Sequence, residues 1–211
     1  MPEILKIDAG NSEEKILARA VEILTGGGII AYPTETFYGL GADATNEKAI
    51  KKVFAAKGRD FKNPVSLIIG QMDDIPPLVQ DIPESARKLM ALFWPGALTI
   101  VFQASKKISP LLRAESGKIG LRVSSHPLAL KIVQKLKKPL TATSANLSGA
   151  PECTLASQVA QQIGDKIDAI VDLGQTTGAQ ASTIIDVTCD PPVILREGVI
   201  SRKTIEKCIN P

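Results

Sequence analysis

The amino-acid sequence predicts an α/β fold, a twisted mixed sheet flanked by helices. Short apolar runs typical of buried strands alternate along the chain with longer stretches whose apolar residues recur at helical spacing. Some links between successive runs are too short for a helical crossover, so antiparallel pairs should accompany parallel ones. No internal repeat, low-complexity tract or flexible linker divides the 211 residues, so one domain is expected over residues 1–211.

Five stretches are predicted to be amphipathic helices. In the first, Asn11 and Glu14 have the spacing of a capping box before an apolar face, and Gly26 supplies a stop signal. The second begins at Asn46, and two others begin at prolines, which are favoured in the first turn of a helix. The predicted helices cover residues 12–25, 46–57, 83–93, 127–136 and 156–163.

Eight further runs have the length and composition of strands. They are rich in Val, Ile, Leu and Thr, and glycine, proline or polar residues bound most of them. The predicted strands cover residues 28–32, 65–69, 97–103, 119–123, 140–143, 169–173, 183–187 and 193–195.

The composition is that of an ordinary globular protein, and it argues against several functional classes. The 25 Lys and Arg against 22 Asp and Glu give a formal charge of +3, too small to indicate nucleic-acid binding by itself. Three widely spaced cysteines without a C-x-x-C pair suggest reduced thiols. Neither a signal peptide nor an 18-residue apolar run is found, so a cytoplasmic protein without a membrane span is expected.

The single histidine, His126, argues against a His-rich zinc site, and we expect no metal site built by the protein. His126 precedes Pro127 at a predicted helix start. Capping that helix, or lying at the surface, is a simpler role for it than catalysis.

Small hydroxyl residues, glycines and fixed cations collect where the buried runs break into loops. Such residues at strand ends indicate a pocket for a small anionic ligand on a rigid scaffold. No obvious base or nucleophile accompanies them, which favours phosphoryl or nucleotidyl transfer, where positioning and charge neutralisation do most of the work. The stretches are residues 33–41 with 57–59, residues 144–146, and residues 182–186 with Arg196.

These stretches also have ordinary structural interpretations that the sequence leaves open. Residues 34–36 could form a plain turn whose hydroxyls bond their own backbone. We expect Lys57 and Arg59 to be solvent-facing cations at the end of a helix. There they could satisfy the last carbonyls of that helix or converge on phosphate oxygens of a ligand. Arg122 interrupts an apolar strand, so it either points to solvent or awaits an anionic ligand such as a carboxylate.

Two further patterns bear on nucleotide binding. No P-loop motif is present. Residues 39–44 match G-x-G-x-x-A, but not at a tight strand-to-helix turn, so a chance match in a glycine-containing loop is favoured over a dinucleotide fingerprint. Ser144 and Asn146, at the end of a strand, could simply cap a helix or turn.

Seven blocks of the sequence together resemble one protein family. They are PTETFYGL (33–40), KGR (57–59), WPGALT (94–99), GLRV (120–123), SAN (144–146), STI (182–184) and LREG (195–198). In this order they resemble the YrdC family of threonylcarbamoyl-AMP synthases, in its short, single-domain form. The resemblance implies a twisted sheet with a large concave, positively charged cavity. It also implies a nucleotidyl transfer that joins L-threonine, bicarbonate or CO2, and ATP into threonylcarbamoyl-AMP and pyrophosphate.

The resemblance assigns roles residue by residue. It implies that Thr36, Arg122 and Ser182 bind threonine, with Arg122 on its carboxylate, and that Lys57 and Arg59 act in catalysis. Mg²⁺ would enter with ATP, and the product would pass to the machinery that transfers threonylcarbamoyl to tRNA, with weak direct RNA or tRNA binding as an additional property. The positions implied around ATP are Lys57, Arg59, Asn63, Ser144, Asn146 and Arg196.

Two other functions compete with the synthase. One is the related module of hydrogenase maturation proteins, which normally belongs to a longer chain with zinc-finger-like cysteines that this sequence lacks. The other is an RNA-binding module, since a basic concavity also accepts a phosphate backbone. The aromatic content of 4% disfavours it, because readers of single-stranded RNA usually stack bases on aromatic rings.

Overall fold

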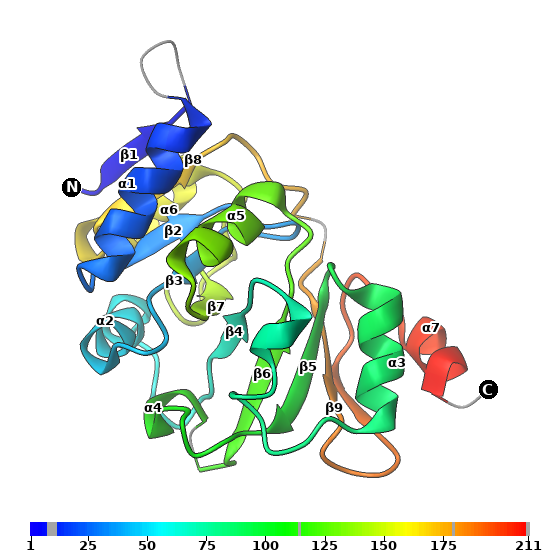
Figure 1. Cartoon of the computed structure of the whole chain (residues 1–211). Helices are drawn as coiled ribbons and strands as arrows, with labels where there is room; N and C mark the ends of the chain where they lie inside the picture. The colour runs from blue at the N-terminus through cyan, green and yellow to red at the C-terminus, as the bar shows by residue number, and fades with distance from the viewer. Residues whose placement is uncertain (8–11, 114, 179, 210–211) are drawn as a thin grey trace.

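The computed structural model describes residues 1–7, 12–113, 115–178 and 180–209. Within these ranges the strands form one sheet in the order β1-β8-β2-β3-β7-β4-β6-β5-β9-β10 (Figure 1). The strands are β1 (Glu3–Lys6), β2 (Ile30–Tyr32), β3 (Gly39–Gly41), β4 (Ser66–Ile68), β5 (Leu98–Gln103), β6 (Lys118–Arg122), β7 (Leu140–Ser144), β8 (Ala169–Asp172), β9 (Thr183–Asp186) and β10 (Val193–Arg196). The helices are α1 (Glu13–Thr25), α2 (Glu47–Lys57), α3 (Glu84–Phe93), α4 (Pro110–Arg113), α5 (Pro127–Leu136), α6 (Ala156–Ile163) and α7 (Arg202–Ile209).

The sheet is mixed, as the short links predicted. At one end β1, β8 and β2 run parallel, and β3 is antiparallel to both β2 and β7. β4 then pairs antiparallel with β7 and parallel with β6. β5 is antiparallel to β6 and parallel to β9, and β10 closes this end antiparallel to β9. The sheet therefore brings strands from both halves of the sequence together at β7, β4 and β6.

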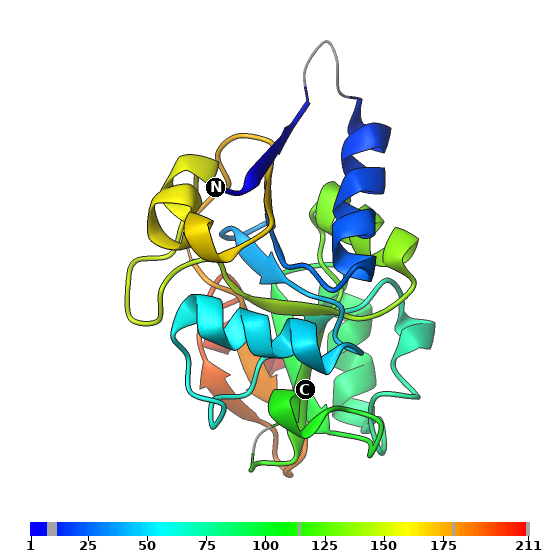
Figure 2. The same ribbon diagram turned by 90° about the vertical axis from the view of Figure 1, so that its left-hand side faces the viewer.

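Helices cover both faces of the N-terminal part of the sheet. Ile30 and Tyr32 of β2 point into a core with α1 and α5, whereas Ile29 and Ala31 point the other way, into a core with α2 and α6. Successive side chains of a strand alternate between faces, so this continuous apolar run is buried on both sides. Figure 2 shows α1 and α6 on opposite sides of these strands. In the C-terminal part, α3 and α7 pack against one face (Figure 1).

The predicted helices and strands are all present, with ends shifted by at most two residues. Asn46 caps α2 by accepting hydrogen bonds from the backbone of Lys48 and Ala49, and Gly58 ends it in the left-handed conformation, φ 59°. The predicted capping box at Asn11 lies outside the described residues. Ser12 is the residue that caps α1.

Four elements were not predicted: β1, β3, α4 and α7. β1 and α7 are polar on one side and lie at the ends of the chain, and α4 is a single turn. Glycines at both ends of β3 are unfavourable in strands, so its sequence indicates a loop. These segments form regular secondary structure only through contacts with the rest of the fold.

The expectation that residues 39–44 form a glycine loop is wrong, and the structure also excludes a dinucleotide turn there. Gly39 and Gly41 belong to β3, in the middle of the sheet. The ring of Tyr32 occupies the space beside them: a Cβ on Gly41 would lie 2.7 Å from Tyr32 Cε1 and 3.0 Å from Leu140 Cδ1. The glycines are needed for this close approach.

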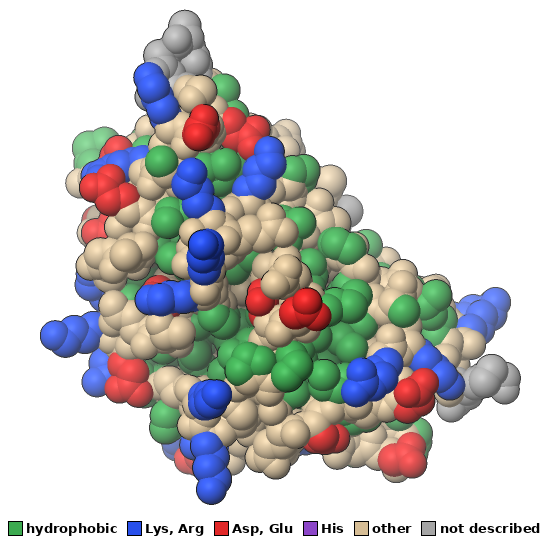
Figure 3. All heavy atoms as spheres, in the orientation of Figure 1, with side chains coloured by type: hydrophobic (Ala, Val, Ile, Leu, Met, Phe, Trp, Pro, Cys, Tyr) green, Lys and Arg blue, Asp and Glu red, His purple; other side chains and the backbone are tan. Residues whose placement is uncertain are grey.

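In the part of the chain that the structure describes, no helix is long and apolar enough to cross a membrane. The outer faces of α1, α5 and α2 carry lysines and arginines interspersed with acidic side chains (Figure 3). On this face the basic side chains are scattered and do not form one patch. This distribution agrees with the small net charge of the sequence.

Gly41→Ala should destabilise the protein by about 1–3 kcal/mol, because the added methyl group overpacks a buried contact with Tyr32 and Leu140. Urea unfolding measures this change. Gly26→Ala is the control, since its Cβ would meet nothing closer than 3.4 Å and its φ of −71° suits any residue. Equal stability of the two variants would contradict the packing argument.

Candidate functional site

A cavity of about 200 Å³ lies where the ends of the central strands meet. The turn after β2 and strands β4 to β7 form one part of its wall, and β9 and β10 form another. Six of the nine residues that the sequence assigned to a site line this cavity. They are Thr36, Arg59, Arg122, Ser144, Ser182 and Arg196.

The turn after β2 is both a hydrogen-bonded turn and part of the cavity wall. Thr34 Oγ1 donates to the carbonyl of Phe37 at 2.7 Å and accepts from the backbone N–H of Thr36 at 3.1 Å. The hydroxyls of Thr34 and Thr36 lie 3.1 Å apart. The two interpretations that the sequence left open are therefore compatible, because the turn presents the Thr36 side chain to the cavity.

The loop after β8 fixes this turn from outside. Thr177 Oγ1 donates to the carbonyl of Glu35 at 2.7 Å, and the N–H of Gly178 donates to the carbonyl of Thr36 at 2.9 Å. Tyr38 OH reaches the carbonyl of Gly174 at 2.8 Å. Residues more than 130 positions apart in the sequence thus hold one another in place at the cavity.

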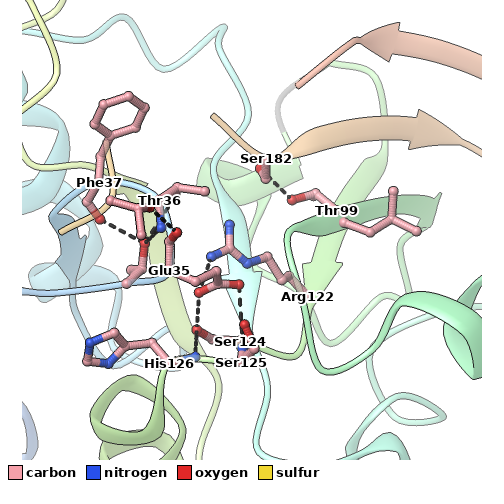
Figure 4. Close-up of polar contacts among 12 residues, drawn as sticks. Glu35, Thr36, Phe37, Thr99, Arg122, Ser124, Ser125, His126 and Ser182 are labelled. Carbon is pink, nitrogen blue, oxygen red and sulfur yellow. Dashed lines mark hydrogen bonds and ion pairs between the residues drawn. The ribbon is translucent and has the colours of Figure 1, made fainter. Parts of the chain in front are cut away.

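Arg122 is buried at the end of β6, and its partner is a carboxylate of the protein itself. Its Nη2 lies 2.7 Å from Oε2 of Glu35 (Figure 4). The side chains are 8% and 15% exposed. The interpretation that Arg122 points to solvent is wrong, and an anion is already present beside it. Nη2 faces Glu35 without the alignment of a hydrogen bond, and neither Nη2 nor the buried Nε has another partner.

Glu35 is held as an anion. Burial favours its neutral form, but the positive charge of Arg122 and the hydrogen bond from Ser124 outweigh burial and keep the pKa of Glu35 below its usual value. Ser124 Oγ donates to Oε2 at 2.5 Å, and the N–H of Ser125 approaches Oε1 at 3.4 Å. The carboxylate is therefore ionised at neutral pH and fixed to the segment that follows β6.

Ser182 belongs to a second polar group on the other side of the cavity. Its hydroxyl lies 3.2 Å from that of Thr99, which is buried on β5. Arg196 donates to the Ser182 carbonyl through Nε at 3.1 Å and Nη2 at 2.8 Å, and Nη2 is 3.1 Å from the hydroxyl. Arg196 thus connects β10 to the start of β9 and still lines the cavity.

Lys57 differs from what the sequence suggested, because it is not a solvent-facing cation. The side chain is 2% exposed, and its ammonium donates to the carbonyls of Ser144 and Asn146 and to Oδ1 of Asn146. These oxygens belong to the end of β7 and the loop after it, so Lys57 does not cap its own helix. Burial and the nearby charge of Arg59 lower the pKa of Lys57 to about 8.

The other predicted nucleotide-side residues near the end of α2 and after β7 have different surroundings. Arg59 lines the cavity and donates to the carbonyls of Asn63 and Pro64, closing the loop after α2. The Asn63 side chain is exposed and does not line the cavity. Asn146 is buried and donates to the carbonyl of Ala150 at 2.6 Å, so it braces a turn and does not cap a helix.

His126 precedes α5, but its side chain does not cap that helix. The half-buried ring leaves Nδ1 without a hydrogen-bond partner, and burial lowers the pKa of the ring. The expected capping role is wrong. The backbone N–H of His126, which donates to Ser124 Oγ at 3.2 Å, supports the loop that holds Glu35.

Three arginines and one glutamate are the charged residues that line the cavity: Arg59, Arg122, Arg196 and Glu152. Because Glu35 offsets part of this charge from outside the cavity, a positive potential inside it stays a prediction. Among the described residues, no group of three or more His, Cys, Asp and Glu side chains could hold a metal ion. The arrangement can bind a small anion by charge and hydrogen bonds from several strands.

Sequence reasoning missed three polar residues of this region as site residues: Glu35, Thr99 and Ser124. Glu35 and Thr99 stood inside the quoted blocks, and their positions next to Thr36 and within an apolar run were the available signal. Ser124 follows Arg122 by two residues, so the same face of an extended chain was a clue. None of these signals indicated which residue would pair with which.

This mixed sheet flanked by helices defines an α/β fold with a cavity at its strand ends, and comparison with known proteins identifies its family. A family model described as "Telomere recombination" and labelled Sua5, YciO and YrdC matches residues 22–198. The chain belongs to the Sua5/YciO/YrdC family.

Its relatives include proteins named threonylcarbamoyl-AMP synthase. One from Pyrococcus abyssi is 39% identical over 203 residues, covering 94% of this chain and 60% of the relative. One from Bacillus subtilis is 39% identical, covering 97% and 59%. A putative one from Methanocaldococcus jannaschii is 33% identical and covers 98% of each. The chain therefore spans about 60% of the length of the first two relatives.

Solved structures agree with this family. P. abyssi Sua5 complexed with L-threonine has a TM-score of 0.92 at 37% identity, covering 100% of this chain and 61% of that protein. Escherichia coli YciO has a TM-score of 0.87 at 26% identity, covering 97% of this chain and 100% of that protein. The predicted fold, a twisted mixed sheet flanked by helices, is confirmed.

Lys57→Met should lower the free energy of unfolding by about 1–3 kcal/mol, because the oxygens of Ser144 and Asn146 lose their buried donor. Urea unfolding measures the loss. The exposed Lys62 on the next loop gives the control: Lys62→Met should stay within about 0.5 kcal/mol of the wild type. A wild-type stability for Lys57→Met would show that these contacts do not brace the loop.

Proposed function

We propose that this chain is a threonylcarbamoyl-AMP synthase, an enzyme that joins L-threonine, bicarbonate or CO2, and ATP with release of pyrophosphate. The observation that supports it most is the position of Arg122, a buried guanidinium at a cavity whose other walls carry Thr36 and Ser182. The relatives' names and the P. abyssi Sua5 complex with L-threonine agree with this assignment.

In this proposal Arg122 binds the substrate carboxylate. A guanidinium offers donors in a planar fork, which suits a carboxylate better than an ammonium does. Thr36 and Ser182 supply hydroxyls for the remaining polar groups of threonine. Thr99 and Arg196 fix the Ser182 side of the pocket, since both contact its hydroxyl.

The nucleotide lies on the side of Arg59, Ser144 and Arg196. Arg59 and Arg196 offset negative charge on the phosphates, and Lys57 adds a positive charge behind Ser144 and Asn146. In this proposal Asn63 contacts the nucleotide from the loop that Arg59 closes. Mg²⁺ enters with ATP and is held mainly by phosphate and water oxygens.

The reaction is a nucleotidyl transfer. The threonine amine and CO2 form a carbamate with loss of one proton, and a carbamate oxygen then attacks the α-phosphorus of ATP. The bond from that phosphorus to the bridging oxygen breaks, and pyrophosphate leaves. The residues at the cavity align the reactants and stabilise the spreading negative charge, which is where most of the catalysis in such transfers arises.

The product is an activated threonylcarbamoyl group, which the machinery that modifies tRNA would consume in the cytoplasm. Weak contact of this chain with tRNA is part of the proposal. Likeness to the hydrogenase maturation protein HypF is limited to 14% identity at a TM-score of 0.76, so it bears on the fold alone.

With ATP and Mg²⁺, the purified protein should release pyrophosphate only when L-threonine and bicarbonate are both present. Exhaustive chelation should stop the reaction, and Mg²⁺ alone should restore it. Arg59→Ala should raise the KM for ATP about ten- to a hundredfold, since a charge-assisted phosphate contact is worth about 1.5–3 kcal/mol. Lys62→Ala is the control. Release without threonine, or a requirement for zinc, would overturn the proposal.

Arg122→Lys should impair use of threonine much more than use of ATP, because lysine keeps the charge and loses the planar fork. Valine should be a poor substrate for the wild type, since the hydroxyl-binding groups would be left unpaired. Serine lacks only a methyl group and should be discriminated by roughly 10–200-fold. Steady-state kinetics with the three amino acids decide this. If valine matched threonine, the pocket assignment would be wrong.

A further inference from the structure

Glu35 contacts the guanidinium of Arg122 from outside the cavity. Arg122 lines the cavity, whereas Glu35 does not. In Figure 4 the carboxylate lies beneath the edge of the guanidinium formed by Nε and Nη2, and the other terminal nitrogen points away from Glu35, toward the space between Thr36 and Ser182. The two edges of one guanidinium therefore face two different places.

Glu35 is fixed more firmly than the ion pair alone would require. Ser124 Oγ and the Ser125 N–H hold its carboxylate, and Thr177 holds its backbone carbonyl. These contacts come from the segment after β6 and from the loop after β8, so the carboxylate cannot follow a moving guanidinium. The position of the carboxylate is therefore set independently of Arg122.

The orientation of the Arg122 side chain depends on this carboxylate. Its ion pair with Glu35 is the one that the described residues provide, and the neighbouring positive charge of Arg196 repels it. A buried guanidinium without a carboxylate would be driven toward solvent or a new rotamer, because burial of an unpaired charge is unfavourable. The direction in which Arg122 offers its free donors is thus set by Glu35.

We infer that Glu35 is a positioning residue, whose carboxylate orients Arg122 so that the free edge of the guanidinium receives the carboxylate of the amino-acid substrate. This inference rests on the proposed function. Glu35 and the substrate then share one guanidinium from opposite edges. Glu35 orients Arg122 and does not compete with the substrate for it, because Ser124 and Ser125 hold Glu35 at its own edge of the guanidinium.

Kinetics of Glu35→Gln test the inference, since glutamine keeps the shape and removes the charge. The KM for L-threonine should rise about ten- to a hundredfold, as expected when a binding group is misplaced by about 1 Å, while the KM for ATP stays within about twofold. Glu35→Asp keeps the charge and should recover part of the loss. Thermal unfolding identifies the temperature at which all variants are folded.

Asp43→Asn is the matched control. Asp43 is also a buried carboxylate that pairs with a cation, Lys138 at 2.6 Å, and accepts from a neighbouring N–H and hydroxyl, those of Thr45, but it does not line the cavity. It should lose stability without a selective change in the KM for threonine. If Glu35→Gln fails to fold, Ser124→Ala removes one support of Glu35 and should raise that KM several-fold.

The outcomes separate the inference from the proposed function. Calorimetry with L-threonine shows whether the wild type binds it at all, and absence of binding would overturn both. If the wild type binds threonine and Glu35→Gln has an unchanged KM for it, or equal changes for threonine and ATP, Glu35 is merely structural. A lower KM for threonine would show that Glu35 competes with the substrate, which also overturns the inference.

Discussion

A charge buried in the middle of a sheet must be paired, and this constraint shapes the structure around Arg122. The guanidinium ends β6 between strands that are buried on both faces, so water cannot solvate it fully. Glu35 supplies the opposite charge, and the turn after β2, the segment after β6 and the loop after β8 all hold Glu35 in place. The ion pair and the hydrogen bonds of Glu35 therefore connect three distant parts of the sequence.

Other polar residues of the site serve the framework in the same way. Lys57 joins the end of α2 to the loop after β7, and Arg196 joins β10 to the start of β9. Each uses some of its donors on backbone carbonyls. The Arg196 side chain also lines the cavity, whereas Lys57 is not among the lining residues. Contacts within the protein thus hold several polar residues of the site in place, which favours the alignment that transfer reactions require.

The sequence alone determined the alternation of strands and helices and the positions of most elements, because apolar periodicity, capping residues and helix-stopping glycines are local signals. It also indicated the family, since seven short blocks in one order are specific together. Six of nine predicted site residues line one cavity, because polar residues at strand ends meet at the same edge of a sheet. The role of these residues, and the single-domain organisation, stay predictions.

Only the tertiary structure decided what each polar side chain contacts. Local sequence showed Arg122 as an unpaired charge, yet its partner Glu35 comes from a turn 87 positions earlier. Local sequence likewise placed Lys57 at a helix end, where solvent is the expected surrounding, and packing of the loop after β7 buried it. β3 is a strand because it pairs with β2 and β7, and its glycines leave space for the ring of Tyr32. Pairing and burial are long-range properties, so they depend on how the sheet brings distant segments together.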